Sequence, residues 1–157
     1  MVFDFSGTSG FRRVLDVKGL STDNGFYVDP DDKLNIWNGS SHAGGNVSDS
    51  GFQHITLTVQ GNAIRGYVNG ALGLSFNSNV MHLNNTDTLN FFLDNTAGGG
   101  QGEYSGGAIA FMRLYSGALT AIEVASLAAA PLPAQNPAPV PLPSSVLLLG
   151  TSVMGSF

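Results

Sequence analysis

The side chains that could perform catalysis are few in this chain of 157 residues. Hydrolysis of a glycosidic bond ordinarily uses two carboxyl groups that flank the bond, one of them an acid with a raised pKa. The eleven acidic residues comprise nine aspartates and two glutamates, Glu103 in a glycine-rich stretch and Glu123 three residues after Thr120. No two of them alternate along a predicted strand. The pattern therefore argues against a hydrolase.

Other nucleophiles and metal ligands are equally sparse. His42, His54 and His82 are far apart, and no His-x-His or His-x-x-x-His spacing occurs. A Gly-x-Ser-x-Gly elbow is missing, so a serine hydrolase has no anchor. The chain has no cysteine, which excludes a thiolate zinc site and a cysteine nucleophile.

Aromatic residues beside amides are a candidate signal of sugar binding. A sugar ring can pack on an aromatic face, while its hydroxyl groups need directional hydrogen-bonding partners. Trp37 with Asn38, and Tyr104 in the glycine-rich stretch, are the predicted ligand-binding residues. The alternative for Trp37, the only tryptophan in the chain, is an ordinary place in the core.

Composition narrows the class of protein. Only 11% of the residues are charged and 21 are glycine, which is typical of a β-rich extracellular module with many turns. A net charge of −5 with six Lys and Arg leaves no basic surface for nucleic acid. A chain without cysteine fits a bacterial secreted protein as readily as a cytosolic one.

The stretch 51–70 carries the clearest fold signal. His54, Thr56 and Thr58 alternate with apolar residues, which predicts a strand with the histidine on its solvated face. The turn residues 60–62 lead into a second strand, and Asn69-Gly70 predicts a tight hairpin into a third.

The remaining elements follow from the same patterns. Thr120 and Glu123 form a capping box, which predicts a helix over 121–129. Polar and glycine-rich composition predicts unpacked loops over 38–50 and 96–107. Alternating apolar residues predict further strands near 2–5, 14–17, 26–28, 34–37, 89–93 and 109–115.

Two groups of residues resemble a known family. They are Phe52-x-His54 followed by Tyr67-Val68-Asn69-Gly70, and the later set Arg113-Leu114-Tyr115, Leu119-Thr120 and Glu123-Val124. Together they resemble laminin-G-like domains of the concanavalin A-like jelly-roll superfamily over residues 1–127. The resemblance implies an all-β antiparallel sandwich over residues 1–130. It also implies that the first strands lie before Met1, with a shortened but complete domain as the alternative.

The resemblance also implies a cation and a limit on catalysis. Laminin-G-like folds often hold Ca²⁺ at the sheet rim, so Asp94, Asn95 and Asp23 are the predicted metal ligands, with calcium as the cofactor. The alternative is that both pairs form Asx turns. The Glu-x-Asp-x-x-Glu motif of the superfamily's glucanases is absent from this sequence.

The end of the chain differs in composition. Six of the seven prolines lie in an Ala/Pro-rich stretch, 131–143, which predicts a disordered linker. Residues 140–157 resemble a PEP-CTERM sorting signal through Val140-Pro141-Leu142-Pro143 and an apolar end. The apolar segment spans twelve residues and no arginine cluster follows, so an apolar tail with chance similarity is the alternative.

Together these patterns predict a non-catalytic exported module of the bacterial cell envelope or extracellular matrix. Its expected partner is an extracellular polysaccharide or a surface protein, and it would contact the membrane only transiently, through the sorting tail. One alternative is a structural or adhesive matrix protein without a specific small ligand. The other is a fragment of a glycan-active enzyme whose catalytic strands lie upstream.

Overall fold

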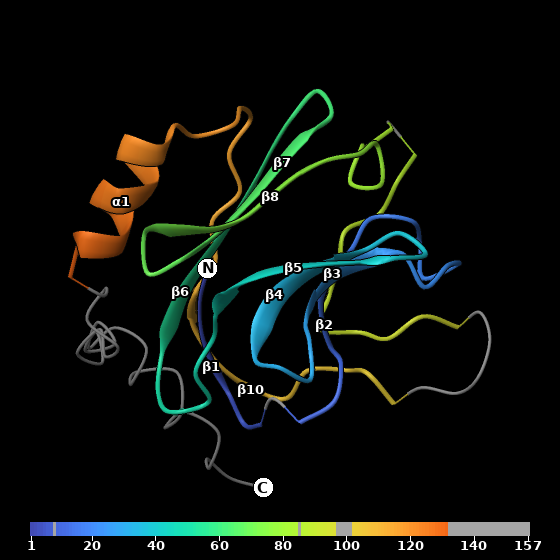
Figure 1. Ribbon diagram of the computed structural model, residues 1–157, viewed down its shortest axis with the longest axis horizontal. Coiled ribbons are helices and arrows are strands. Elements are labelled where there is room, and N and C mark those ends of the chain that lie inside the picture. Colours follow the sequence, from blue (N-terminus) through green and yellow to red (C-terminus); the bar gives the residue numbers. More distant parts are fainter. Residues whose placement is uncertain (8, 85, 97–101, 132–157) are drawn as a thin grey trace, which may run out of the picture.

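The computed structural model describes residues 1–7, 9–84, 86–96 and 102–131, and the predicted linker and sorting tail lie outside this part of the chain except for Pro131. Two five-stranded antiparallel sheets pack face to face (Figure 1). The first sheet has the order β10-β1-β6-β7-β8 and the second β5-β4-β3-β2-β9. The predicted all-β antiparallel sandwich is therefore confirmed. The strands are β1 (Val2–Phe5), β2 (Arg12–Asp16), β3 (Gly25–Val28), β4 (Lys33–Trp37), β5 (Ser41–Asn46), β6 (Gln53–Gln60), β7 (Ala63–Val68), β8 (Ala71–Asn77), β9 (Asn90–Phe91) and β10 (Gly107–Phe111).

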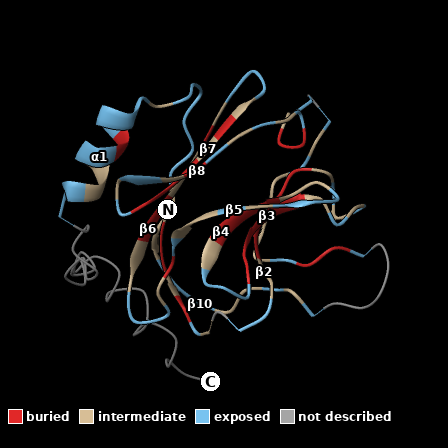
Figure 2. Ribbon diagram, in the orientation of Figure 1, coloured by how far each residue is buried: buried red, intermediate tan, exposed pale blue. Residues whose placement is uncertain are grey.

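The core lies between the two sheets, where the period-2 alternation of each strand places its apolar side chains (Figure 2). In the second sheet Val14, Phe26 and Val28 face the core, so Arg13 and Tyr27 lie on the opposite, outer face. The fully buried apolar residues also include Phe3, Phe5, Leu34, Ile36, Ile55 and Ile64. Outer-face positions of the second sheet are thus available for polar chemistry.

The predicted meander is confirmed as β6, β7 and β8. Asn69 and Gly70 both have positive φ, +50° and +84°, the geometry that a tight hairpin turn requires. His54, however, is only 9% exposed, so the prediction of a solvated position is wrong. The centroids of the His54 and Phe111 rings lie 6.0 Å apart. Burial lowers the pKa of His54.

The predicted helix is confirmed as α1 (Ala121–Ala129), with the Thr120 and Glu123 capping box formed. Val124 is its fully buried residue, and the helix packs beside the β7–β8 turn (Figure 1). Close packing there suits Gly70, because a Cβ at that position would lie 3.1 Å from Ala125 Cα. No helix in the described ranges is long and apolar enough to span a bilayer.

The polar stretch 38–50 contains strand β5, which corrects the prediction of a loop. Its sequence signal is weak because glycine replaces the alternating apolar residues. Those glycines let β5 approach β8 of the other sheet. A Cβ on Gly44 would lie 2.1 Å from Gly73 O, and a Cβ on Gly73 would lie 2.3 Å from Gly45 Cα. Tertiary contact between sheets, rather than local propensity, makes this segment a strand.

Two predicted strands are shorter than expected. The 89–93 strand is reduced to β9, because Phe92 has a φ of +62° and leaves the extended conformation. The 109–115 strand ends with β10, and beyond it Leu114 is 70% exposed. Hydrophobicity alone therefore overestimated both lengths.

The contact between β5 and β8 gives a stability prediction. Gly73→Ala forces a methyl group into the Gly45 backbone, and overpacking of this kind costs about 3 kcal/mol, or about 10 °C in Tm. The matched control is Gly117→Ala, since no atom lies within 4 Å of its ideal Cβ. Thermal unfolding of both variants checks this, and equal Tm values would contradict the assignment of β5.

Candidate functional site

A buried guanidinium organises the outer face of the second sheet. Arg13 is 0% exposed, and its Nη1 donates to Asp16 Oδ2 at 3.1 Å. Its Nη2 donates to Asp23 Oδ1 at 3.4 Å and to the Tyr27 hydroxyl oxygen. Both Nη atoms also donate to the carbonyl oxygen of Thr22, at 3.3 and 3.4 Å. Charge-assisted bonds of this kind hold the 22–24 turn against β2.

Local backbone features make room for Arg13. The β2–β3 register shifts between Arg13 and Leu15, which is the mark of a bulge that re-aims side chains. A Cβ on Gly25 would lie 3.3 Å from Tyr27 Cε2 and 3.6 Å from Arg13 Cζ. The guanidinium therefore lies over the Tyr27 ring, with Cζ 4.8 Å from the ring centroid.

The three predicted metal ligands come together beside this cluster. Asn95 Nδ2 donates to Asp23 Oδ1 at 3.1 Å, and the backbone N–H of Asn95 donates to Asp94 Oδ1 at 2.7 Å. Asp94 Oδ2 accepts from the backbone N–H groups of Gly102 and Glu103, at 2.8 and 3.0 Å. Asp94 thus holds residues 102–103, within the glycine-rich stretch, against the sheet.

The side chains of Asp94, Asn95 and Asp23 do not suit calcium in the hydrogen-bonded arrangement that they adopt here. Calcium takes six to eight oxygen ligands. A carboxylate offers about four acceptor positions, and those of Asp94 accept four hydrogen bonds. Within the described ranges, no three His, Cys, Asp or Glu side chains are grouped to hold a metal ion. The calcium site therefore stays a prediction, and the ion would have to displace several N–H groups.

The glycine-rich stretch packs on β2, which corrects the expectation of an unpacked loop for residues 102–105. Arg13 N donates to Glu103 O at 2.6 Å, and Ser105 Oγ donates to Arg13 O at 2.7 Å. Burial raises the pKa of Glu103, and the Asp23 and Asp94 carboxylates raise it further. Glu103 therefore joins the acidic side of the Arg13 cluster.

The predicted sugar-binding residues lie at different places on this face. Trp37 is half-buried, with its ring 6.0 Å from Phe11, which in turn lies 5.9 Å from the Tyr27 ring. Asn38 lines a polar hollow. Tyr104 is 59% exposed and forms a bridge with Arg13, and among the described residues its ring does not contact Trp37. Phe11 is an aromatic member of the face that sequence reasoning missed.

The polar hollow adjoins the Arg13 cluster through the 21–24 turn and has a volume of about 670 Å³. Lys18 Nζ lies across it, bound to Asp87 Oδ2 at 3.1 Å and to His82 O at 2.7 Å. Amide, hydroxyl and charged groups dominate its lining. Besides those three residues, the lining consists of Ser21, Thr22, Asn24, Asn38, Ser78, Asn79, Val80 and Asn84. The density of Asn and Ser in 77–87 is the sequence signal that could have indicated this hollow.

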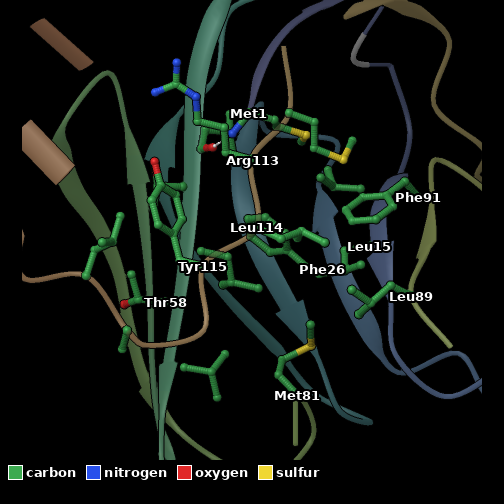
Figure 3. Close-up of a pocket in the computed structure, with 18 of the residues that line it drawn as sticks. Met1, Leu15, Phe26, Thr58, Met81, Leu89, Phe91, Arg113, Leu114 and Tyr115 are labelled. Atoms are coloured by element: carbon green, nitrogen blue, oxygen red, sulfur yellow. Dashed lines mark hydrogen bonds between the residues drawn. The ribbon is translucent and has the colours of Figure 1, made fainter. Parts of the chain in front are cut away.

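A second hollow, of about 360 Å³, is mostly apolar (Figure 3). It lies between β6 and the segment after β10, with Leu15, Phe26 and Phe91 of the other sheet in its lining. Met1 N donates to Ile55 O at 2.8 Å at its edge. Sugar hydroxyl groups need polar partners, so the polar hollow suits them better than this apolar one.

Comparison with known proteins gives two findings. A family model described as the concanavalin A-like lectin/glucanases superfamily matches residues 4–125. The crystal structure of an S-layer domain-containing protein (residues 221–444) from Clostridium thermocellum ATCC 27405 is similar at 16% identity and a TM-score of 0.46. That match covers 76% of this chain and 64% of the other, and at this level it supports no statement about function. No curated protein matches the chain.

The raised pKa of Glu103 gives a pH prediction. The contribution of Glu103 to the free energy of unfolding is fully present below the ordinary pKa of a carboxyl group. It is lost as the pH rises through the raised pKa of the folded state, because ionising Glu103 costs more in the folded chain than in the unfolded chain. Glu103→Gln removes this loss, so its Tm at pH 7 should exceed that of the parent chain, with no difference at about pH 4.

Glu123→Gln is the matched control. The backbone N–H of Thr120 lowers the pKa of Glu123, so folding favours the ionised form of this carboxyl group instead of opposing it. That variant should gain nothing at pH 7. A Glu103→Gln variant that melts below the parent at pH 7 would contradict the electrostatic account.

Proposed function

Because the chain belongs to the concanavalin A-like lectin/glucanases superfamily, we propose that it is an exported, non-catalytic module that binds carbohydrate in the polar hollow. The observation that carries the proposal is the lining of that hollow, in which amides of Asn24, Asn38 and Asn79 surround a concave space. Amides both donate and accept hydrogen bonds, as sugar hydroxyl groups do. A volume of about 670 Å³ is in the range of small-molecule sites.

The aromatic side of the site supports the same ligand class. Trp37 directly precedes Asn38, and its half-buried ring packs against Phe11 at the end of β4. A ring held by its neighbours offers contact area without losing much conformational entropy on binding. Tyr104 lies apart, beside Arg13. We assign it to the edge of the face rather than to the hollow.

The placement of the carboxyl groups supports a non-catalytic role. Glu123 accepts from the Thr120 backbone in the capping box. Glu103 lies next to Asp94 and Asp23, whose oxygens already accept hydrogen bonds from Gly102 N and Asn95 Nδ2. A general acid and a base across one sugar linkage need two available carboxyl groups. Incubation with β-glucans should therefore release no reducing ends, and release that Glu103→Gln abolishes would overturn this part.

Two features of the sequence support export and an extracellular partner. The Val140-Pro141-Leu142-Pro143 motif with its apolar end resembles a sorting signal, and the weakly charged, glycine-rich composition suits an extracellular module. The ligand we propose is accordingly a polysaccharide of the cell envelope or extracellular matrix. A surface protein is the second partner class.

The binding test uses the full chain on a broad glycan panel, followed by calorimetry with the best ligand. Trp37 is the only tryptophan, so its fluorescence should change on binding at the neighbouring hollow. Asn38→Ala and Asn79→Ala each remove amide partners and should weaken binding by about tenfold.

Asn46→Ala is the control, because Asn46 is an exposed amide at the opposite end of the β4–β5 pair, across from Lys33. Its affinity should match that of the parent chain. Binding that all three variants retain would exclude the hollow as the site. A folded chain that binds no glycan would instead favour a structural or adhesive matrix role.

A further inference from the structure

We infer that the Arg13 guanidinium is the resident cation of this rim, and that the domain orders its rim and polar hollow without a bound metal ion. The family resemblance leads one to expect calcium where Asp94, Asn95 and Asp23 meet. At that place the described chain has a fixed positive charge of its own. The inference stands whether or not the hollow binds sugar.

The first support is the way the guanidinium is held. Both Nη atoms of Arg13 donate to acidic side chains or to the Thr22 carbonyl oxygen, and the side chain is completely buried. One of its carboxylate partners, Asp16, is also completely buried, and the other, Asp23, is 53% exposed. A buried charge of this kind is stable only with its partners in place. Arg13 thus ties β2 to the 22–24 turn, as a metal ion bridging two carboxylates would.

The second support is that hydrogen-bond donors already surround the carboxylates of Asp16 and Asp94. Asp16 Oδ1 accepts from the backbone N–H groups of Lys18 and Leu20, at 3.0 and 2.8 Å. Asn90 Nδ2 adds a third bond to the same oxygen at 3.4 Å. Asp94 accepts from three backbone N–H groups and one amide. These N–H groups occupy acceptor positions of both carboxylates that a metal ion would need.

The third support is that the backbone of Arg13 completes the same rim. Its N–H donates to Glu103 O and its carbonyl oxygen accepts from Ser105 Oγ, while its side chain holds Thr22 O. The 22–24 turn and the 103–105 segment are therefore both fixed by one residue. The turn also lines the polar hollow through Thr22 and Asn24. Loss of Arg13 should consequently disturb the hollow, whereas removal of calcium should not.

The first experiment is thermal unfolding of the full chain in EDTA and in about 10 mM CaCl₂, about tenfold above the weakest dissociation constants of extracellular calcium modules. The expected result is the same Tm within about 1 °C, since a ligand that binds only the native state would raise it. A saturable rise of several degrees with CaCl₂, absent with MgCl₂ and lost in Asp94→Asn, would overturn the inference.

The second experiment compares two neighbouring arginines. Arg13→Met keeps the length of the side chain but removes the charge that Asp16 and Asp23 require, so its Tm should fall by about 10 °C or more. Arg12→Met is the control, because the half-buried Arg12 bonds, within the described part of the chain, to Ser9 Oγ and to the carbonyl oxygens of Phe11 and Gly102 rather than to a carboxylate. Its Tm should change by about 2 °C or less.

A third variant keeps the comparison decisive if Arg13→Met does not fold. Arg13→Lys retains the charge but loses the fork that reaches several acceptors, and its Tm should lie between those of Arg13→Met and the parent chain. Equal stability of the Arg13→Met and Arg12→Met variants would contradict the role of Arg13. The calcium titration of the parent chain needs no variant and decides the metal question independently.

Discussion

A positive charge buried on the outer face of a β-sheet must be surrounded by acceptors, and this requirement organises one end of the sandwich. Arg13 meets it with Asp16, Asp23, Tyr27 and the Thr22 carbonyl oxygen. Because Thr22 and Asp23 belong to the turn between β2 and β3, their bonds to the guanidinium also set the shape of that turn. The same turn forms one wall of the polar hollow. Stability and binding geometry are therefore linked through a single side chain.

A second constraint, the close approach of the two sheets at β5 and β8, depends on residues that have no side chain. Gly44, Gly45 and Gly73 bring the strand backbones together where any Cβ would collide. The contact holds β5 beside β4, whose end carries Trp37 and Asn38. Trp37 thus lies at the end of a strand that is paired on both sides, with Asn38 directly after it, which favours a preorganised binding surface over an adaptable one.

Local patterns predicted the central hairpin and the capped helix, because each is determined by neighbours within a few residues, while the family resemblance predicted the sandwich. They failed for β5 and for His54, whose environments are created by segments distant in sequence. The candidate site shows the same division. Asp94, Asn95 and Asp23 were identified and do meet, but Arg13 was missed. The neighbouring Arg12 and Arg13 carry no sequence signal that distinguishes the buried charge from the more exposed one.

Amide chemical-shift mapping of the full chain tests the account most directly. The chain would be titrated in EDTA with the glycan that binds best. The account predicts perturbations that cluster at Thr22, Asn24, Asn38 and Asn79 around the polar hollow, with saturation in the absence of calcium. Perturbations confined to the apolar hollow at Leu89 and Leu114, or binding that appears only when calcium is added, would contradict it.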